Sequence, residues 1–392
     1  MNAPAARGIL IAGGGTAGHV LPGLAIAEAL VDRGVVADRS GVHLVGSRRG
    51  IEVDLVPPTG FGLTVLPGRG IQRRLTPANL AAATGLLLAV VRALVLVARR
   101  RPSVVVSLGG YASVPCVVAA AVLRVPVVVA EQNAVPGAAN RLAGRFARAC
   151  AVSFPDTDLP RSTVTGNPVR GAIREVAEAD DRATRRAEAR AALDVDDRPF
   201  VVVFGGSLGA RRINRAVARA VEDWTGGPLI VEHVVGPRGW VGGPEQARTP
   251  GPGVEYRRVE YEVDMPTVLS AVDLAVCRAG ATSVAELAAL GVPSILIPLP
   301  VAPGDHQTAN ARHLEAAGGA RLVADEDLDG DRLGAELVTL LGGSALLAAM
   351  ADGARSVGRP DAADRVVDVI VGVLGGPSGG PGSVGDGSGS ES

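Results

Sequence analysis

Short apolar runs that end in glycine turns constrain this chain most. Four of them, at residues 9–12, 104–108, 200–204 and 274–277, are too short for helices and are typical of strands buried in a parallel sheet. Each is followed by a glycine turn and then by a helix-like pattern. The pattern that begins at residue 9 begins again at residue 200. This repetition predicts an α/β fold with two similar open domains that face each other.

The length of 392 residues also favours two domains, because one hydrophobic core rarely supports so long a chain. Pro168 holds Asn167 extended, which indicates a linker at this point. The expected limits are residues 1–165 for the first domain, 166–355 for the second, 356–374 for a C-terminal helix that packs back on the first domain, and 375–392 for a disordered tail rich in Gly, Ser and Pro.

Charge and cysteine usage exclude several classes of protein. The net charge of -1 gives no reason to expect a nucleic-acid partner. Cys116, Cys150 and Cys277 are widely spaced and odd in number, so neither a disulfide framework nor a zinc site is indicated. The apolar run after residue 7 is too short for a signal peptide. We therefore expect a reducing, cytoplasmic setting.

Two segments predict long helices. The apolar stretch 81–98 could span a bilayer by its length, but Arg92 lies in its middle, which costs about 2.5–3.5 kcal/mol in a membrane. We expect instead a buried crossover helix that leads to the strand at 104–108. Alternating charges through 174–197 predict one solvated helix.

A basic loop precedes the apolar helix. Residues 69–75 carry three arginines beside Ile71 and Leu75. Apolar side chains among arginines can dock on an anionic bilayer surface. A solvated loop explains the same composition, so the sequence leaves both interpretations open.

The first glycine turn leads to a histidine. Residues 13–18 follow the first strand, and the next helix is expected over 20–33. Glycines let the backbone approach a ligand closely, but their spacing here differs from the dinucleotide fingerprint. His19 would lie at the helix entry, where an imidazole either caps the helix or faces a ligand.

Polar residues also follow two neighbouring strands. Tyr111 comes after the strand at 104–108, and Glu131, Gln132 and Asn133 come after the strand at 125–130. Polar side chains are costly to leave unpaired in a crevice. We expect ligand contacts at this sheet edge, with helix capping by Asn133 as the alternative.

The stretch 274–310 predicts a second ligand site. A strand, a glycine turn and a helix ended by Gly291 are followed by a strand over 294–299. Helix N-termini bind phosphates at such edges, so residues 278–286 are a candidate diphosphate and ribose site. Ser283 and Glu286 could instead form a capping box. The polar loop after the next strand, which opens at the same edge, favours the ligand site.

Seven blocks together resemble the MurG family of peripheral membrane glycosyltransferases. The blocks are GGGTAGHVLPGLA (13–25), SLGGYASVP (107–115), EQNAVPGAANR (131–141), GNPVR (166–170), FGGSLGA (204–210), RAGATSVAE (278–286) and DHQTANA (305–311). The resemblance implies GT-B architecture, with two facing Rossmann-like domains. It also implies transfer of N-acetylglucosamine (GlcNAc) from UDP-GlcNAc to a lipid-linked N-acetylmuramyl (MurNAc)-pentapeptide, at the cytoplasmic face of an anionic membrane and without a cofactor.

The resemblance also implies roles for individual residues. It places Thr16, Ala17 and Gly18 at the sugar and phosphates, Asn133 at the sugar, Arg170 and Ser207 near the nucleotide or diphosphate, Tyr261 near uracil, Ala281, Thr282 and Glu286 in the phosphate and ribose block, and Gln307 at the sugar hydroxyls. Ala17 departs from a glycine common in the family. Glu262 departs from a usual apolar residue, so only a backbone contact carries over there.

The family reaction inverts the anomeric centre and needs a base and a stabiliser of the leaving diphosphate. His19 is the candidate base and Glu131 the runner-up. With no Asp-x-Asp motif at a candidate sheet edge, backbone N–H groups and Arg170 are expected to replace a metal ion. Two alternatives remain: a GT-B transferase acting on a small natural product, and a non-catalytic UDP-sugar-binding scaffold.

Overall fold

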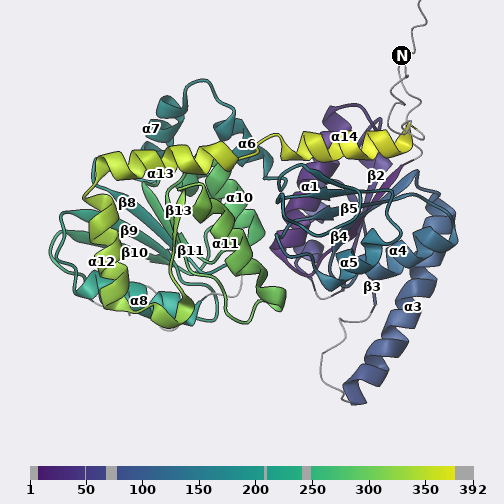
Figure 1. Ribbon diagram of the computed structural model, residues 1–392, viewed down its shortest axis with the longest axis horizontal. Helices are drawn as coiled ribbons and strands as arrows, with labels where there is room; N and C mark the ends of the chain where they lie inside the picture. Colours follow the sequence, from purple (N-terminus) through teal and green to yellow (C-terminus); the bar gives the residue numbers. More distant parts are fainter. Residues whose placement is uncertain (1–7, 49, 68–76, 207–209, 241–248, 376–392) are drawn as a thin grey trace, which may run out of the picture.

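The chain forms two α/β units that lie side by side (Figure 1). The computed structural model describes residues 8–48, 50–67, 77–206, 210–240 and 249–375. Each unit is built on one parallel sheet with helices on both faces. The prediction of two similar open α/β domains is confirmed.

The N-terminal sheet has seven strands in the order β3-β2-β1-β4-β5-β6-β7, all parallel. Its strands are β1 (Ile9–Gly13), β2 (Val42–Ser47), β3 (Gly62–Leu66), β4 (Val104–Gly109), β5 (Val127–Glu131), β6 (Ala149–Val152) and β7 (Ser162–Val164). The helices between them are α1 (Ala17–Asp32), α2 (Glu52–Leu55), α3 (Pro77–Arg100), α4 (Ser113–Val122) and α5 (Ala138–Gly144). The chain order reverses between β1 and β4, where ligands bind in open α/β sheets.

The C-terminal sheet has six parallel strands in the order β10-β9-β8-β11-β12-β13. They are β8 (Phe200–Phe204), β9 (Leu229–Val234), β10 (Val254–Val259), β11 (Leu274–Cys277), β12 (Ser294–Leu296) and β13 (Ala320–Leu322). The helices are α6 (Gly171–Ala177), α7 (Arg182–Ala192), α8 (Arg211–Glu222), α9 (Met265–Ala271), α10 (Ala281–Leu290), α11 (His306–Ala316), α12 (Gly330–Leu341), α13 (Ser344–Val357) and α14 (Ala362–Leu374).

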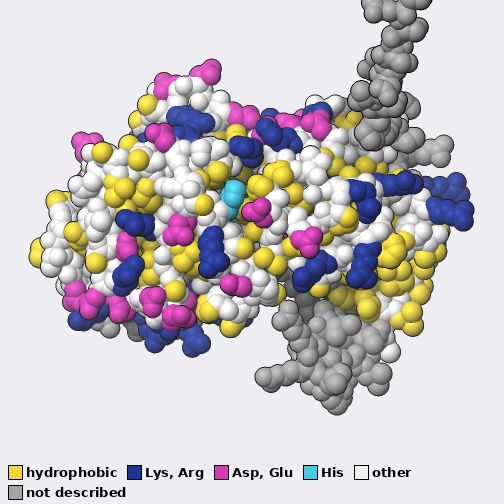
Figure 2. Space-filling model, viewed as in Figure 1, with side chains coloured by type: hydrophobic (Ala, Val, Ile, Leu, Met, Phe, Trp, Pro, Cys, Tyr) yellow, Lys and Arg dark blue, Asp and Glu magenta, His cyan; other side chains and the backbone are white. Residues whose placement is uncertain are grey.

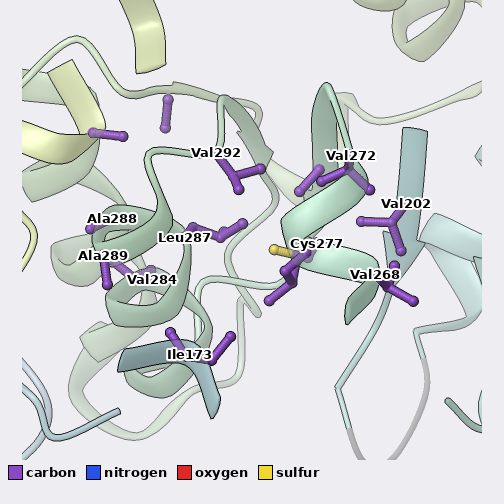
Figure 3. Packing of buried hydrophobic residues seen from close by; sticks show 14 of the residues in the cluster. Ile173, Val202, Val268, Val272, Cys277, Val284, Leu287, Ala288, Ala289 and Val292 are labelled. Carbon is purple, nitrogen blue, oxygen red and sulfur yellow. The ribbon is translucent and has the colours of Figure 1, made fainter. Parts of the chain in front are cut away.

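Helix α10 is held by a continuous apolar core. Val284 and Leu287 on its buried face belong to the same cluster as Ile173 of α6 and Val268 of α9, and Cys277 of β11 lies between these elements (Figure 3). The helix ends at Gly291, whose φ of 73° is left-handed and suits glycine. Close packing of this kind fixes the direction in which the N-terminus of α10 points.

The expectation of one solvated helix over 174–197 is wrong. Helices α6 and α7 are separate, and Asp181 caps α7 by accepting the Thr184 N–H at 2.9 Å. Aspartate at such a position competes with helix continuation, because its side chain bonds the backbone N–H groups of a new first turn.

The expectation that the apolar helix at 81–98 is buried is also wrong. Ala89, Ala93 and Val97 of α3 are buried, whereas Leu87 is 67% exposed and Val91 is 49% exposed. The apolar residues therefore form two faces, of which only one packs on the domain. Among the described residues no single helix is long and apolar enough to cross a membrane, although the bent pair of Gly330–Leu341 and Ser344–Leu374 passes the length and composition criteria.

The last helix returns to the first domain. Val366, Val367 and Ile370 of α14 belong to the same buried cluster as residues of α1 and β1. Contacts of this kind link the two ends of the chain (Figure 1). The domain limits 1–165 and 166–355 remain our proposal, and the tail from residue 376 lies outside the described residues.

Removing the buried part of α14 should destabilise the N-terminal domain. Ile370 is fully buried, so Ile370→Ala should lower the free energy of unfolding by about 2–5 kcal/mol in urea titrations. Val371, the next residue, is 38% exposed, and Val371→Ala should change the free energy of unfolding by less than about 0.5 kcal/mol. Equal effects of the two substitutions would contradict the packing of α14 on this domain.

Candidate active site

The N-termini of two helices, one from each domain, face each other across the domain boundary. These two helices are α1 of the N-terminal domain and α10 of the C-terminal domain. Helix α10, with α11, lies on the side of the C-terminal unit that faces the N-terminal unit (Figure 1). A methyl group added at Gly18 of α1 would lie 3.9 Å from Oγ1 of Thr282 in α10. That hydroxyl is buried and has no hydrogen-bond partner among the described residues. Both helix starts offer unpaired N–H groups, so an anion can bind between them.

His19 lies in the first turn of α1, beside this gap. Its Nδ1 shares a hydrogen bond of 3.2 Å with Thr16 Oγ1. Desolvation lowers the pKa of His19, and the neighbouring His306 acts in the same direction, whereas the charges of Glu131 and Glu52 raise it. The net shift is downward, so the imidazole is neutral near pH 7 and can accept a proton.

The glycine turn after β4 passes close to the imidazole of His19. Gly109, at the end of β4, has a φ of 92°, and a Cβ there would lie 3.4 Å from His19 Nε2.

Helix α1 begins at Ala17, three residues earlier than expected, and Ala17 has no positive φ. Alanine therefore fits where the family often has glycine, because a helical residue needs no left-handed backbone.

Glu131 is buried behind the loop that follows β5. Its carboxylate is 3% exposed and accepts four hydrogen bonds. The donors are Asn133 N–H at 3.0 Å, Asn133 Nδ2 at 3.2 Å, Gly137 N–H at 3.1 Å and Asn140 Nδ2 at 2.9 Å. These four hydrogen bonds fix the loop after β5, which suits a structural role for Glu131 better than proton transfer.

Asn133 and Asn310 connect the two domains. Asn310 of α11 is fully buried, its Oδ1 accepts the Ala134 N–H at 2.9 Å, and its Nδ2 donates to Asn133 Oδ1 and to Ala279 O at 3.2 Å each. With Glu131, these groups form a chain of hydrogen bonds from β5 to the loop before α10. The contact of Asn133 with a sugar stays a prediction, since both ends of its side-chain amide are already used in this structure.

Arg170 and Glu286, both expected at the nucleotide, are paired with each other. Arg170 Nε and Nη2 donate to the two carboxylate oxygens of Glu286 at 2.7 and 2.8 Å. The capping box of Ser283 and Glu286 is not formed, because α10 begins at Ala281 with Gly280 as its N-cap. Glu286 is buried, so a nucleotide that reaches it must replace or share the guanidinium.

The other expected site residues lie in three places. Tyr111 follows β4, and its hydroxyl donates to Pro67 O at 2.8 Å. Tyr261 follows β10 and is 60% exposed. Gln307 opens α11, and its Oε1 accepts the Leu299 N–H at 3.0 Å. Ser207 lies outside the described residues.

Several residues near the gap escaped the sequence analysis. His306 and Asn310 belong to the block at 305–311, so that block carried a usable signal. Asn140 likewise belongs to the block at 131–141. Glu52 is a buried polar residue whose partner Gly15 is distant in the sequence, which no local pattern shows. Among the described residues no group of three His, Cys, Asp or Glu side chains could hold a metal ion. The expectation of a metal-independent site stays a prediction.

Family profiles match both halves of the chain. The glycosyltransferase family 28 N-terminal domain matches residues 9–152, and the family 28 C-terminal domain matches residues 200–366. Two relatives carry the name UDP-N-acetylglucosamine–N-acetylmuramyl-(pentapeptide) pyrophosphoryl-undecaprenol N-acetylglucosamine transferase. The protein of Nocardioides sp. is 43% identical, covering 93% of this chain and 97% of its own, and that of Desulforudis audaxviator is 39% identical, covering 92% and 97%.

Solved structures agree with this assignment. MurG of Acinetobacter baumannii superposes with a TM-score of 0.72 at 28% identity, covering 93% of this chain and 98% of its own. The UDP-GlcNAc 2-epimerase of Neisseria meningitidis, at 12% identity and a TM-score of 0.62, covers 93% and 99% and shares the fold alone. The expected GT-B architecture is confirmed, and the chain belongs to the MurG family of family 28 glycosyltransferases.

Proposed function

We propose that this enzyme transfers GlcNAc from UDP-GlcNAc to the C4 hydroxyl of MurNAc in undecaprenyl-pyrophosphoryl-MurNAc-pentapeptide, a step in peptidoglycan synthesis. The observation that carries the proposal is the facing pair of helix N-termini, with the neutral imidazole of His19 at their boundary. A diphosphate between α1 and α10 would place the anomeric carbon of its sugar near His19. The relatives named for this reaction support the choice of substrates.

The reaction is a single displacement at the anomeric carbon. The acceptor hydroxyl forms the new C–O bond while the bond from that carbon to UDP breaks, and His19 takes the hydroxyl proton. Negative charge grows on the departing diphosphate. The backbone N–H groups that open α10, together with Arg170, stabilise that charge.

A transfer assay tests this function directly. Radiolabelled GlcNAc should move from UDP-GlcNAc to a prenyl-pyrophosphoryl-MurNAc-pentapeptide, and not to small natural-product aglycones. Transfer to aglycones alone would support the natural-product alternative. UDP-GlcNAc binding without turnover on either acceptor would support the scaffold.

Glu286 should contribute to nucleotide affinity through the ribose hydroxyls. Glu286→Ala should weaken UDP-GlcNAc binding by about 1.5–3 kcal/mol, as expected for hydrogen bonds to a charged group, in isothermal titration. Glu178→Ala is the matched control, because Glu178 pairs with Arg174 in a surface ion pair on α6. A lower melting temperature with unchanged UDP-GlcNAc affinity would show that Glu286 only supports the fold.

Removing His19 should lower the turnover number strongly. His19→Ala should lower kcat by about 10²–10⁴-fold with little change in UDP-GlcNAc affinity, as expected for a missing general base. His313→Ala is the control, since this histidine also has a lowered pKa but packs edge-to-face against Phe154, with 5.1 Å between the ring centroids. Retention of more than about a tenth of wild-type kcat would transfer the role to Glu131 or to solvent.

The same base predicts a pH profile. Only the neutral imidazole accepts a proton, and burial holds the pKa of His19 below its ordinary value of 6.5. The kcat/KM of the wild-type enzyme, which reports the free enzyme, should therefore be above half its maximum at pH 6.5 and fall to half only at lower pH. A loss of half the activity at or above pH 6.5 would contradict the assignment.

We further propose that the enzyme docks on the cytoplasmic face of an anionic membrane through the exposed face of α3. Leu87, Leu88, Val91 and Val95 form this face. Apolar side chains gather over α3 with basic side chains at the border (Figure 2). Residues 77–130 contain five arginines and no acidic residue, which suits an anionic surface. The basic loop at 69–75 lies outside the described residues.

Acidic substitutions on this face should prevent membrane binding. Leu87→Glu with Val91→Glu should abolish flotation with anionic vesicles, because burying two carboxylates opposes apolar insertion. Wild-type flotation should weaken with salt, at about 1 kcal/mol for each basic residue near the surface. Val338→Glu with Leu346→Glu, at exposed sites in the C-terminal domain, is the control. Equal flotation of both double variants would refute docking through α3.

A further inference from the structure

Glu52 joins the first glycine turn to the end of a neighbouring strand. It opens the short helix α2 and is only 2% exposed. Its Oε2 accepts the Gly15 N–H at 2.9 Å, and its Oε1 accepts the Ser47 N–H. One carboxylate thus binds the turn after β1 and the last residue of β2 at the same time, through charge-assisted hydrogen bonds.

Three glycines surround this carboxylate closely. A Cβ at Gly14 would lie 2.3 Å from Oε1, one at Gly46 would lie 2.3 Å from Cγ, and one at Gly50 would lie 2.0 Å from Oε2. Real Cβ atoms do not approach other atoms so closely. The space around Glu52 is therefore shaped for its side chain, and the surrounding backbone has no room for others.

The turn that Glu52 holds determines where His19 lies. Gly15 has a φ of 97°, which glycine adopts readily. Fixing a glycine in one conformation costs much backbone entropy, so this turn needs an anchor. The next residue, Thr16, accepts the N–H groups of His19 at 3.1 Å and Val20 at 3.2 Å, and its hydroxyl bonds the imidazole. A displacement of Gly15 would therefore pass directly to Thr16 and His19.

We propose that Glu52 is a positioning residue that clamps the first glycine turn, so that Thr16 and His19 keep their places at the domain boundary. In this role Glu52 contacts neither the UDP-sugar nor the acceptor substrate. Its effect on turnover rests on the proposed role of His19, but the clamp itself does not. The charges that act on His19 are those of Glu131, Glu52 and His306.

Glu52→Gln tests the clamp, because glutamine keeps the size, removes the charge and turns an amide N–H toward a backbone N–H. Hydrogen exchange at the Gly15 amide should become at least about tenfold faster, as expected for a lost anchor. In NMR titrations the pKa of His19 should fall, since a neighbouring negative charge is gone. The kcat should fall by about tenfold or more while KM for UDP-GlcNAc stays within about twofold.

Asp54→Asn is the matched control, because Asp54 is an exposed carboxylate on the same helix. It should leave all four measurements unchanged. If Glu52→Gln leaves Gly15 exchange and the His19 titration at wild-type values, the proposal is overturned. If His19→Ala retains turnover while Glu52→Gln still frees Gly15, the base assignment fails and the clamp stands.

If Glu52→Gln does not fold, hydrogen exchange at the Gly15 amide of the wild-type protein tests the clamp. Gly15 is exposed, so without a partner its amide should exchange at nearly the rate of an unstructured peptide. The clamp requires exchange at least about tenfold slower than that rate. Exchange at the unstructured rate would overturn the proposal without any variant.

Discussion

Parallel strand pairing is the constraint on which the rest of this structure depends. It brings the carboxyl ends of all strands in a sheet to one edge, together with the turns that lead into the helices. Those turns expose N–H groups that the helices themselves cannot satisfy. In each domain the edge is therefore rich in donors, and the gap between the domains is suited to anions before any side chain contributes.

Two buried carboxylates use some of these donors and give the gap its shape. Glu131 accepts hydrogen bonds from the loop after β5, and Glu52 accepts them from the turn after β1 and from the last residue of β2. Burying a charge is unfavourable unless it is hydrogen-bonded. Because both side chains depend on backbone N–H groups, each fixes a loop that would otherwise have many conformations.

The sequence predicts four strands well, β1, β4, β8 and β11, because each is a short apolar run that ends in a glycine turn. The strands β8 and β11 have their expected limits, whereas β12 ends at Leu296 instead of residue 299. The errors occur where a partner distant in the sequence decides. Neither the ligand site nor the capping box considered for Glu286 includes its pair with Arg170. Helix α3 keeps one apolar face exposed although its composition is that of a core helix. Resemblance to a family supplied site residues that periodicity alone does not identify.

The Arg170–Glu286 pair has a consequence for the kind of molecule that can enter the C-terminal edge. A free phosphate that drew Arg170 away would leave a buried carboxylate alone, and a nucleoside that engaged Glu286 would leave the guanidinium without its acceptors. Either exchange is unfavourable by itself. A ligand that carries a diol and an anion at a fixed separation can satisfy both groups at once. The ion pair would thus disfavour binding of a free phosphate or a free nucleoside and favour a nucleotide that carries both groups.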